Sequence, residues 1–248
     1  WLLQNGLTQT HQNNMGAFGG PDIITDGLVF SIDAGSTRSY PGTGTAVTNL
    51  SGTVDATLEN GAVFSSSNGG VFDLDGVDDF ISTSSLTGTD LEFLSNPQNN
   101  TSLTYSIWSY NESSSSYYLF STGSQTSSTG VALSYQAGSG FVSISTPTKS
   151  QSVYGLGSYW PLNEWVQFTW VSSGLTYSFY KNGVLILSGN ITGNTTLTDV
   201  QSTLGIGRPN NSPCCEFDGK VGGVLVYNAA LTAAEVLQNY NAQKNRFI

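Results

Sequence analysis

The stretch FDGKVGGVLVYNAALTAAEVLQNYNAQKNRF, residues 217–247, joins a strand pattern directly to a helix pattern. Its first part, KVGGVLVY (220–227), is rich in β-branched residues and predicts a β-strand. Its second part, LTAAEVLQNYNAQ (231–243), predicts a helix that follows the strand after a short connection. No other part of the chain has an equally convincing helix pattern, so the remaining sequence is expected to form strands and turns.

The start of this helix is marked by its sequence. Thr232 is a good N-cap, and Glu235 stands three residues later, where its side chain can reach back to the N–H group of the cap. Val236, Leu237 and Tyr240 give the helix one apolar face. We therefore expect a short helix that docks on the edge of a sheet.

The rest of the chain consists of short strand patterns separated by Gly, Ser, Asn and Pro clusters. In LTYSFYKNGVLILSG (175–189), Asn182-Gly183 lies between two alternating apolar runs and predicts a type I′ hairpin. Further strands are predicted at residues 28–33, 69–75, 79–83, 103–110, 117–122, 131–136, 141–146, 165–172 and 202–207. Roughly a dozen short strands with turns between them predict an all-β sandwich or barrel.

Composition limits the possible partners. Charged residues make up 10% of the 248-residue chain, and the formal net charge is −10. Nucleic acid is not an expected partner, because phosphate binding needs clustered Lys and Arg and the chain has only 7 of them. No apolar run approaches the roughly 18 residues of a membrane span, so membrane insertion is not expected. Few lysines and many hydroxyl groups favour a protein that works outside a cytoplasm.

Residues 1–26 lack a sustained hydrophobic period. We predict an N-terminal arm or linker over residues 1–26 and one domain over residues 27–248. Because the chain opens on Trp1, we expect a processed N-terminus or a piece of a longer product. An apolar-tipped arm without a core of its own is expected to anchor the domain to a larger assembly. A homo-oligomer is also left open.

The two cysteines, Cys214 and Cys215, are adjacent. One interpretation is a pair of free thiols in a loop before a strand, since a disulfide between neighbours closes a strained ring. The other is a vicinal disulfide that forms a rigid, apolar loop tip. A zinc site of the Cys/His type is not expected, because no CxxC pair is present and His11 is the only histidine.

Taken together, these segments resemble laminin-G-like, concanavalin A-like lectin/glucanase domains. The resemblance covers residues 26–247, and GLVFSIDAGSTRSYPGTGT and VFDLDGVDDFIST look like the opening strands of that family. Its closing pattern is matched by Gly219, Val226, Tyr227, Leu231, Thr232, Glu235 and Val236. Parts of the chain are similar to domains of tailed-bacteriophage virion proteins. The resemblance implies a jelly-roll sandwich of two curved antiparallel sheets.

The segment VFDLDGVDDFIST (71–83) carries four aspartates within a few positions. Asp and Asn favour tight turns, because their side chains bond to nearby backbone N–H groups, so a structural turn is one prediction. A calcium site shared with another loop is the alternative, with Asp78 and Asp79 as its ligands. The spacing does not match an EF-hand loop. Apart from calcium, no cofactor is expected.

Catalysis is not expected. Glycanases with the resembled fold carry a Glu-x-Asp-x-x-Glu pattern on one strand, which places the nucleophile and the acid/base on one face. No segment of this sequence completes that pattern, and Gly76 interrupts the strand at DLDGVDD. The single His11 leaves no credible base for a serine triad.

Binding is expected instead, and aromatic residues in loops are the candidates for stacking on sugar rings. We identify Tyr110, Tyr154, Tyr159 and Trp160 as candidate ligand-binding residues, with SVYGLGSYWP (152–161) as the best loop. The alternative for Trp160 is a core position. Trp108, Trp165 and Trp170 lie in predicted strands and are expected in the core.

The sequence therefore predicts a non-enzymatic attachment or decoration module on a virion surface or in an extracellular setting. Its expected partners are cell-surface glycans or other virion proteins. Three alternatives stay open: a purely structural protein that cements a capsid or fibre, a calcium-dependent lectin and, least favoured, a glycoside hydrolase.

Overall fold

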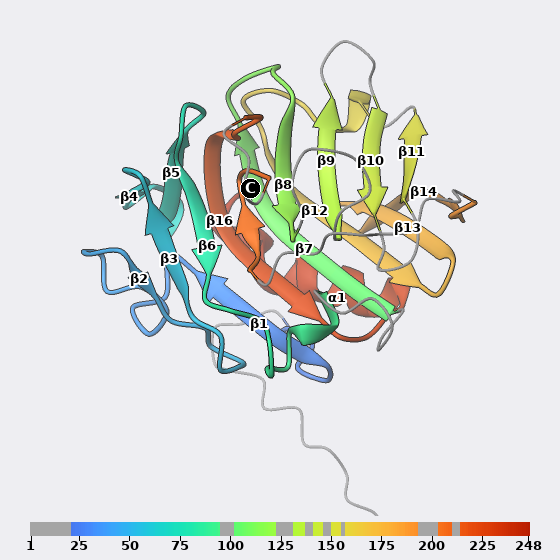
Figure 1. The fold of residues 1–248 in the computed structure, drawn as a ribbon, viewed down its shortest axis with the longest axis horizontal. Coiled ribbons are helices and arrows are strands. Elements are labelled where there is room, and N and C mark those ends of the chain that lie inside the picture. Colours follow the sequence, from blue (N-terminus) through green and yellow to red (C-terminus); the bar gives the residue numbers. More distant parts are fainter. Residues whose placement is uncertain are drawn as a thin grey trace, which may run out of the picture.

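The computed structural model describes residues 21–94, 102–122, 131–136, 141–145, 150–154, 157–192, 203–209 and 214–248. Within these ranges, sixteen strands form two eight-stranded sheets in which every strand pairing is antiparallel. Figure 1 shows the two sheets as curved layers, with the single α-helix behind one of them. This is the expected all-β sandwich with one short C-terminal helix.

The first sheet has the order β14-β13-β12-β7-β16-β5-β4, and β1 also pairs with β16. Its strands are β1 (Leu28–Asp33), β4 (Val63–Ser65), β5 (Val71–Asp75), β7 (Ser102–Asn111), β12 (Trp165–Ser173), β13 (Thr176–Lys181), β14 (Val184–Asn190) and β16 (Asp218–Tyr227). The predicted hairpin is confirmed between β13 and β14, where Asn182 and Gly183 have φ of 53° and 76°. A Cβ at position 183 would also lie 2.9 Å from Leu237 Cδ1, so glycine is required there.

The second sheet has the order β11-β10-β9-β8-β15-β6-β3-β2. Its strands are β2 (Ala46–Val47), β3 (Ala56–Glu59), β6 (Phe80–Thr83), β8 (Tyr117–Ser121), β9 (Ala132–Gln136), β10 (Phe141–Ser145), β11 (Ser150–Tyr154) and β15 (Gly205–Ile206). Single turns of 3₁₀-helix occur at η1 (Ser67–Gly69), η2 (Glu92–Leu94), η3 (Gly157–Tyr159) and η4 (Lys244–Arg246).

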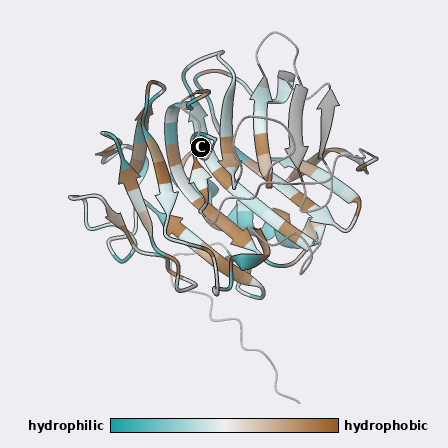
Figure 2. Ribbon diagram, in the orientation of Figure 1, coloured by the Kyte–Doolittle hydropathy of each residue, from teal (hydrophilic) through white to brown (hydrophobic). Residues whose placement is uncertain are grey.

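The main core lies between the sheets and is built from alternate residues of their strands. Phe72 and Leu74 of β5 and Tyr105 and Ile107 of β7 are all buried in it. Successive side chains of a strand point to opposite faces, which is why Asp73 lies outside this core. Figure 2 shows the result as hydrophobic bands separated by paler residues along the strands.

The outer face of the first sheet is covered by α1 (Ala233–Gln243) and the C-terminal residues. Trp108 of β7 stacks on Phe247 with ring centroids 4.4 Å apart. β7 and β12 are therefore buried on both faces. The prediction that Trp108, Trp165 and Trp170 belong to the core is confirmed.

The helix begins as predicted, with Thr232 as N-cap and the capping box to Glu235. Its predicted apolar face is wrong at Leu237, whose exposed fraction is 43%. Asn239 is buried instead, with an exposed fraction of 2%. Its amide donates to Tyr227 Oη (2.9 Å) and accepts from the N–H group of Ile24 (2.8 Å). A hydrogen-bonded amide thus takes the place expected for an apolar contact, because it has two partners below the helix.

The segment before β1 is docked on the body of the domain. Ile23 and Ile24 pack against the cluster beneath α1, and Gln238 Nε2 donates to the carbonyl oxygen of Asp22 (2.8 Å). Residues 1–20 of the predicted arm lie outside the described residues, so its anchoring role stays a prediction. The one described helix, α1, is too short to span a membrane.

Candidate functional site

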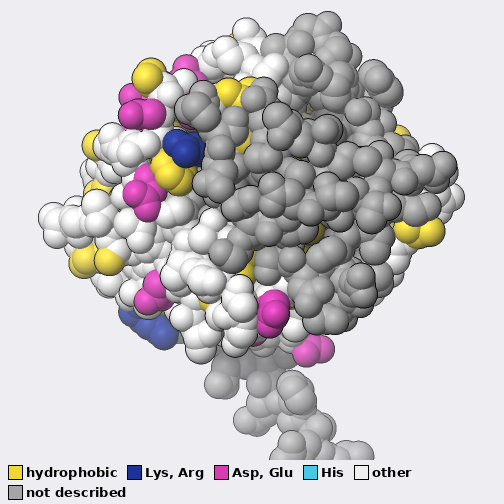
Figure 3. All heavy atoms as spheres, in the orientation of Figure 1, with side chains coloured by type: hydrophobic (Ala, Val, Ile, Leu, Met, Phe, Trp, Pro, Cys, Tyr) yellow, Lys and Arg dark blue, Asp and Glu magenta, His cyan; other side chains and the backbone are white. Residues whose placement is uncertain are grey.

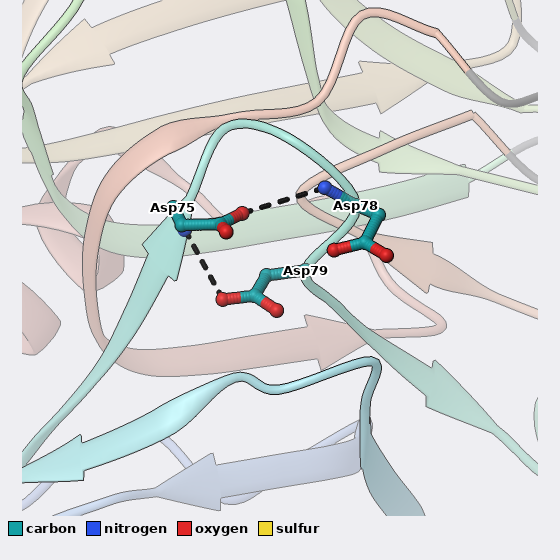
Figure 4. A group of neighbouring side chains, drawn as sticks. All are labelled: Asp75, Asp78 and Asp79. Carbon is teal, nitrogen blue, oxygen red and sulfur yellow. Dashed lines mark hydrogen bonds between the residues drawn. The ribbon is translucent and has the colours of Figure 1, made fainter.

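The connection between β5 and β6 is a tight turn held by its own carboxylates (Figure 4). Asp75 Oδ1 accepts hydrogen bonds from the N–H groups of Val77 (2.8 Å) and Asp78 (3.4 Å). Asp79 Oδ2 accepts from the N–H group of Asp75 (3.2 Å). Gly76 has φ of 70°, and a Cβ there would lie 2.5 Å from Asp218 Cβ. The aspartates therefore form the structural turn that their spacing predicts.

These hydrogen bonds and the burial of Asp79 shift the pKa values of Asp75 and Asp79 in opposite directions. The hydrogen bond from Val77, joined by weaker ones from neighbouring N–H groups, lowers the pKa of Asp75 below its usual value of 3.8. Asp79 is buried, with an exposed fraction of 5%. Loss of hydration raises the pKa of Asp79, and the negative charges of Asp75 and Asp78 raise it further.

The same turn brings together three carboxylates that could hold a cation. One oxygen each of Asp75, Asp78 and Asp79 lies within 4.8 Å of the others. Calcium takes about 6–8 oxygen ligands, so these residues would supply part of a coordination shell and water would supply the rest. Asp75 Oδ1 and Asp79 Oδ2 already accept backbone hydrogen bonds. A calcium ion would therefore have to share them with the turn.

Further acidic side chains reach this end of the sandwich from other strands. Asp218 of β16 lies opposite Asp75, and Lys220 lies opposite Asp73. We call Asp73, Asp75, Asp78, Asp79, Glu112 and Asp218 the acidic rim. Partial burial raises the pKa of Asp73 and of Asp218, and Glu112 raises both further. Among the side chains that are coloured in Figure 3, the few basic ones stand apart from one another.

Lys220 and Tyr110 adjoin the rim on the outer face of the first sheet. Lys220 pairs with Glu112 and lies 3.9 Å from Asp73. Its ammonium group is 5.3 Å from the ring centroid of Tyr110. Tyr110 is half-buried and packs against Trp165. The rim therefore has one aromatic surface beside its carboxylates.

A second aromatic surface, Phe80, follows Asp79 directly. The guanidinium carbon of Arg208 lies 3.8 Å from the ring centroid of Phe80. Arg208 directly follows Gly207, whose carbonyl oxygen accepts a hydrogen bond from the N–H group of Phe217 (2.6 Å). The sequence did not single out Arg208 or Phe80, because only the register of β6 with β15 brings them together.

Cys214 and Cys215 lie shortly before Phe217 and form a vicinal disulfide. The second of the two interpretations of these cysteines is therefore the one found in this structure. The N–H group of Tyr118 donates to the carbonyl oxygen of Cys215 (3.1 Å), which joins the segment to β8. Both cysteines are half-buried.

The candidate aromatic residues do not form one site. Trp160 has an exposed fraction of 7% and packs on Phe168 in the main core, with ring centroids 4.0 Å apart. Tyr159 is half-buried against the same core. The side chain of Tyr154 lies outside the described residues. Of the three candidates whose side chains are described, Tyr110 alone lies beside the acidic rim.

Sequence reasoning missed that Glu216 and Asp218 have the spacing of the first two residues of the glycanase pattern. The third position is Val221, which is fully buried in the core. A catalytic acid cannot be supplied from that place. Asp75 and Asp79 are a second pair of carboxylates to consider, because they lie close together and their pKa values shift in opposite directions. Both carboxylates, however, already accept hydrogen bonds that hold the turn.

Comparisons with known proteins agree on the fold. The sequence profile of the concanavalin A-like lectin/glucanases superfamily matches residues 75–237. No curated protein matches the chain in sequence.

Solved structures match at low sequence identity. The binding domain of botulinum neurotoxin serotype D has a TM-score of 0.63 and 16% identity, over 89% of this chain and 53% of that chain. The binding domain of botulinum neurotoxin DC in complex with SialylT has a TM-score of 0.61 and 12% identity, over 88% and 52% of the two chains. A Trypanosoma rangeli sialidase mutant displaying trans-sialidase activity has a TM-score of 0.62 and 16% identity, over 92% and 35%. The chain thus spans about half of each binding domain and about a third of the sialidase, and the likeness shows the fold alone.

Proposed function

Because the chain belongs to the concanavalin A-like lectin/glucanases superfamily, we propose that it is a glycan-binding module without catalytic activity. The proposed binding surface is the acidic rim together with the rings of Tyr110 and Phe80. A solved structure with this fold holds SialylT, which supports the choice of glycans as the ligand class.

One observation carries this proposal: at the rim, carboxylates fixed by backbone N–H groups stand beside half-buried aromatic rings. Asp75 and Asp79 are held by the turn, and Phe80 follows them directly. Fixed carboxylates accept strong hydrogen bonds from sugar hydroxyls, and ring surfaces pack on the apolar faces of sugars. Since these groups are already ordered, little further ordering opposes binding.

We propose calcium-dependent binding as a second form of this function. A cation at Asp75, Asp78 and Asp79 would neutralise part of the rim and offer coordination positions to sugar hydroxyls. The module would then be a calcium-dependent lectin. Without calcium, the same carboxylates would act as direct hydrogen-bond acceptors.

The setting we propose is a virion surface or another extracellular site. The vicinal disulfide supports it, since disulfides persist in oxidising compartments and are rare in reducing ones. Few lysines and many hydroxyl groups fit the same setting. In this setting we propose that the module attaches to cell-surface glycans. We also propose contacts with other virion proteins and association with further copies of the chain.

A glycan array tests the proposal, with the purified chain screened in calcium and in a chelator. We expect reproducible binding to a family of related glycans. For neutral glycans we expect a clear reduction for the double variant Asp73→Asn/Asp218→Asn, which removes two rim acceptors; for acidic glycans the same variant removes repulsion and should not weaken binding. The control is Asp26→Asn, an exposed acidic residue of the segment before β1. Absence of binding in both buffers would favour the structural cementing role. Release of shortened sugars from a bound oligosaccharide would instead establish a hydrolase.

A further inference from the structure

Arg208 differs from the other described basic residues. The chain has a net charge of −10, and most of its described cations have a polar partner. Lys181 pairs with Glu164, Lys220 with Glu112, Arg246 with Asp33, and Lys244 bonds to Asn241. Arg38 is exposed to water. Arg208 is only partly exposed and makes no ion pair with any described residue.

The guanidinium group is nevertheless fixed in place. It lies over Phe80, with 3.8 Å between its central carbon and the ring centroid. Its Nε is buried and has no hydrogen-bond partner among the described residues. A buried N–H group without an acceptor is unfavourable, and the loss is larger for a charged group. The partly exposed guanidinium group thus carries its charge beside Phe80 without an ion-pair partner among the described residues.

Near Arg208 the chain also has an apolar group, which suits a sugar with one charged side and one apolar side. The half-buried Cys214–Cys215 disulfide lies shortly before Phe217, whose N–H group donates to the carbonyl oxygen of Gly207. A disulfide between neighbours has no hydrogen-bond donor and presents an apolar surface. The site therefore combines a cation with a ring beneath it, and the disulfide belongs to the segment that bonds to Gly207.

We propose that Arg208, stacked on Phe80, binds the carboxylate of an acidic sugar. This inference rests on the proposed glycan-binding function and names the class of glycan. The fork of a guanidinium group matches the two oxygens of a planar carboxylate, so one sugar carboxylate can bond to its two terminal nitrogens together. Arg208 is thus the specificity-determining residue of the rim.

The negative charges of the acidic rim repel the carboxylate of an acidic sugar, so its attraction to Arg208 has to be stronger than this repulsion. Exposed charges are screened beyond about 8 Å at physiological ionic strength, whereas partly buried pairs in contact are screened much less. The local pair with Arg208 must therefore exceed the repulsion from Asp78 and its neighbours. Added salt should weaken the repulsion more than the pair. We expect affinity for the acidic sugar to be retained as salt is raised.

Calorimetric titration tests the inference with five probes. They are a sialylated oligosaccharide, a glucuronic-acid-terminated one, the carboxyl-reduced form of each, and a sulfated neutral oligosaccharide. We expect binding of at least one carboxylated probe and a loss of roughly tenfold to a hundredfold for its carboxyl-reduced form. Arg208→Gln should cause a similar loss for the carboxylated probe alone. Arg208→Lys, which keeps the charge without the fork, should lose affinity as well.

Arg38→Gln is the matched control, because it makes the same charge change at an exposed position and should leave affinity unchanged. Thermal unfolding of each variant shows whether the fold is retained. The inference is overturned if Arg208→Gln folds and binds the carboxylated probe normally, or if only the sulfated probe binds. Binding of neutral glycans alone would overturn it and leave the proposed function standing. Absence of binding to any glycan would overturn both.

Discussion

Two aspartates of one turn, Asp75 and Asp79, differ in what their charge does to the fold. The carboxylate of Asp75 is exposed and accepts two backbone N–H groups, which favours its ionised form. Asp79 is buried beside Asp75, so its ionised form is disfavoured by lost hydration and by like charge. One negative charge therefore stabilises the folded turn and the other destabilises it.

Neutralising each of these residues should change stability with opposite signs. Asp75 has a lowered pKa in the folded state, so its stabilisation is present above the usual value of 3.8 and is lost as pH falls through the lowered value. Asp79 has a raised pKa, so its stabilisation is full below 3.8 and is lost as pH rises through the raised value. At neutral pH we expect Asp75→Asn to lower the free energy of unfolding and Asp79→Asn to raise it.

Urea unfolding at a series of pH values measures this difference. Both effects should shrink toward zero in acid, where the wild-type carboxyls are protonated as well. Asn at position 79 keeps an acceptor for the Asp75 N–H group, so the comparison isolates the charge. A shift of both variants in the same direction at neutral pH would contradict the assignment.

Calcium binding by Asp75, Asp78 and Asp79 has its own test. A cation that binds only the folded state raises its stability by about 2.7 kcal/mol at a hundred times its dissociation constant. We expect calcium to raise the melting temperature of the wild type and to have a much smaller effect on Asp78→Asn. Magnesium is the control ion, since it demands near-octahedral geometry. An equal calcium shift in Asp78→Asn would place the ion elsewhere.

Sequence alone predicted only the local part of this site. The turn at Asp75–Asp79 could be recognised because the bonds that hold it join residues within a few positions. The approach of Asp218 and Arg208 depends on strand register between segments more than 100 residues apart. Trp160 illustrates the same limit: the sequence left both a ligand-binding and a core position open for it, and the packing of its ring against Phe168 shows the core position.

At the level of elements, strong local patterns gave the right structure. The capping box fixed the start of α1, and Asn182-Gly183 fixed the β13–β14 turn. The strands β2, β3, β4 and β11 were not predicted. Three of them have at most four residues, and β11, SQSVY, is mostly polar, so pairing with neighbours outweighs their weak intrinsic patterns.

Asn239 is the element-scale feature that the helix pattern could not reveal. It joins α1 to Tyr227 of β16 and to the segment before β1. We expect Asn239→Ala to lower the free energy of unfolding by about 1–3 kcal/mol, because the Ile24 N–H group loses its acceptor in a buried place. Urea unfolding measures this loss, provided that the dependence of the unfolding free energy on urea concentration is the same for the wild type and the variant.

Gln238→Ala is the matched control for that substitution. Its amide bonds to Asp22 in the same segment, but at an exposed position. The expected change is within about 0.5 kcal/mol. Equal effects of the two variants would mean that burial of Asn239 does not determine its contribution.

At the scale of the whole molecule, the C-terminus closes the outer face of the first sheet. Arg246 donates to the carbonyl oxygens of Asn68 and Gly70 and pairs with Asp33 of β1. Phe247 covers Trp108 and Trp165. The chain end therefore completes the hydrophobic covering of this sheet, while the acidic rim is left accessible beyond it.

The location of glycan binding tests the central claim most directly. We would titrate the isotope-labelled chain with the strongest glycan from the array and follow its backbone amide signals by NMR. The account expects the largest shifts at residues 75–80, at Gly207–Arg208 and at Asp218, with Asn239 unchanged. Shifts confined to the region of Tyr159 and Trp160, or no shift at any glycan concentration, would contradict it.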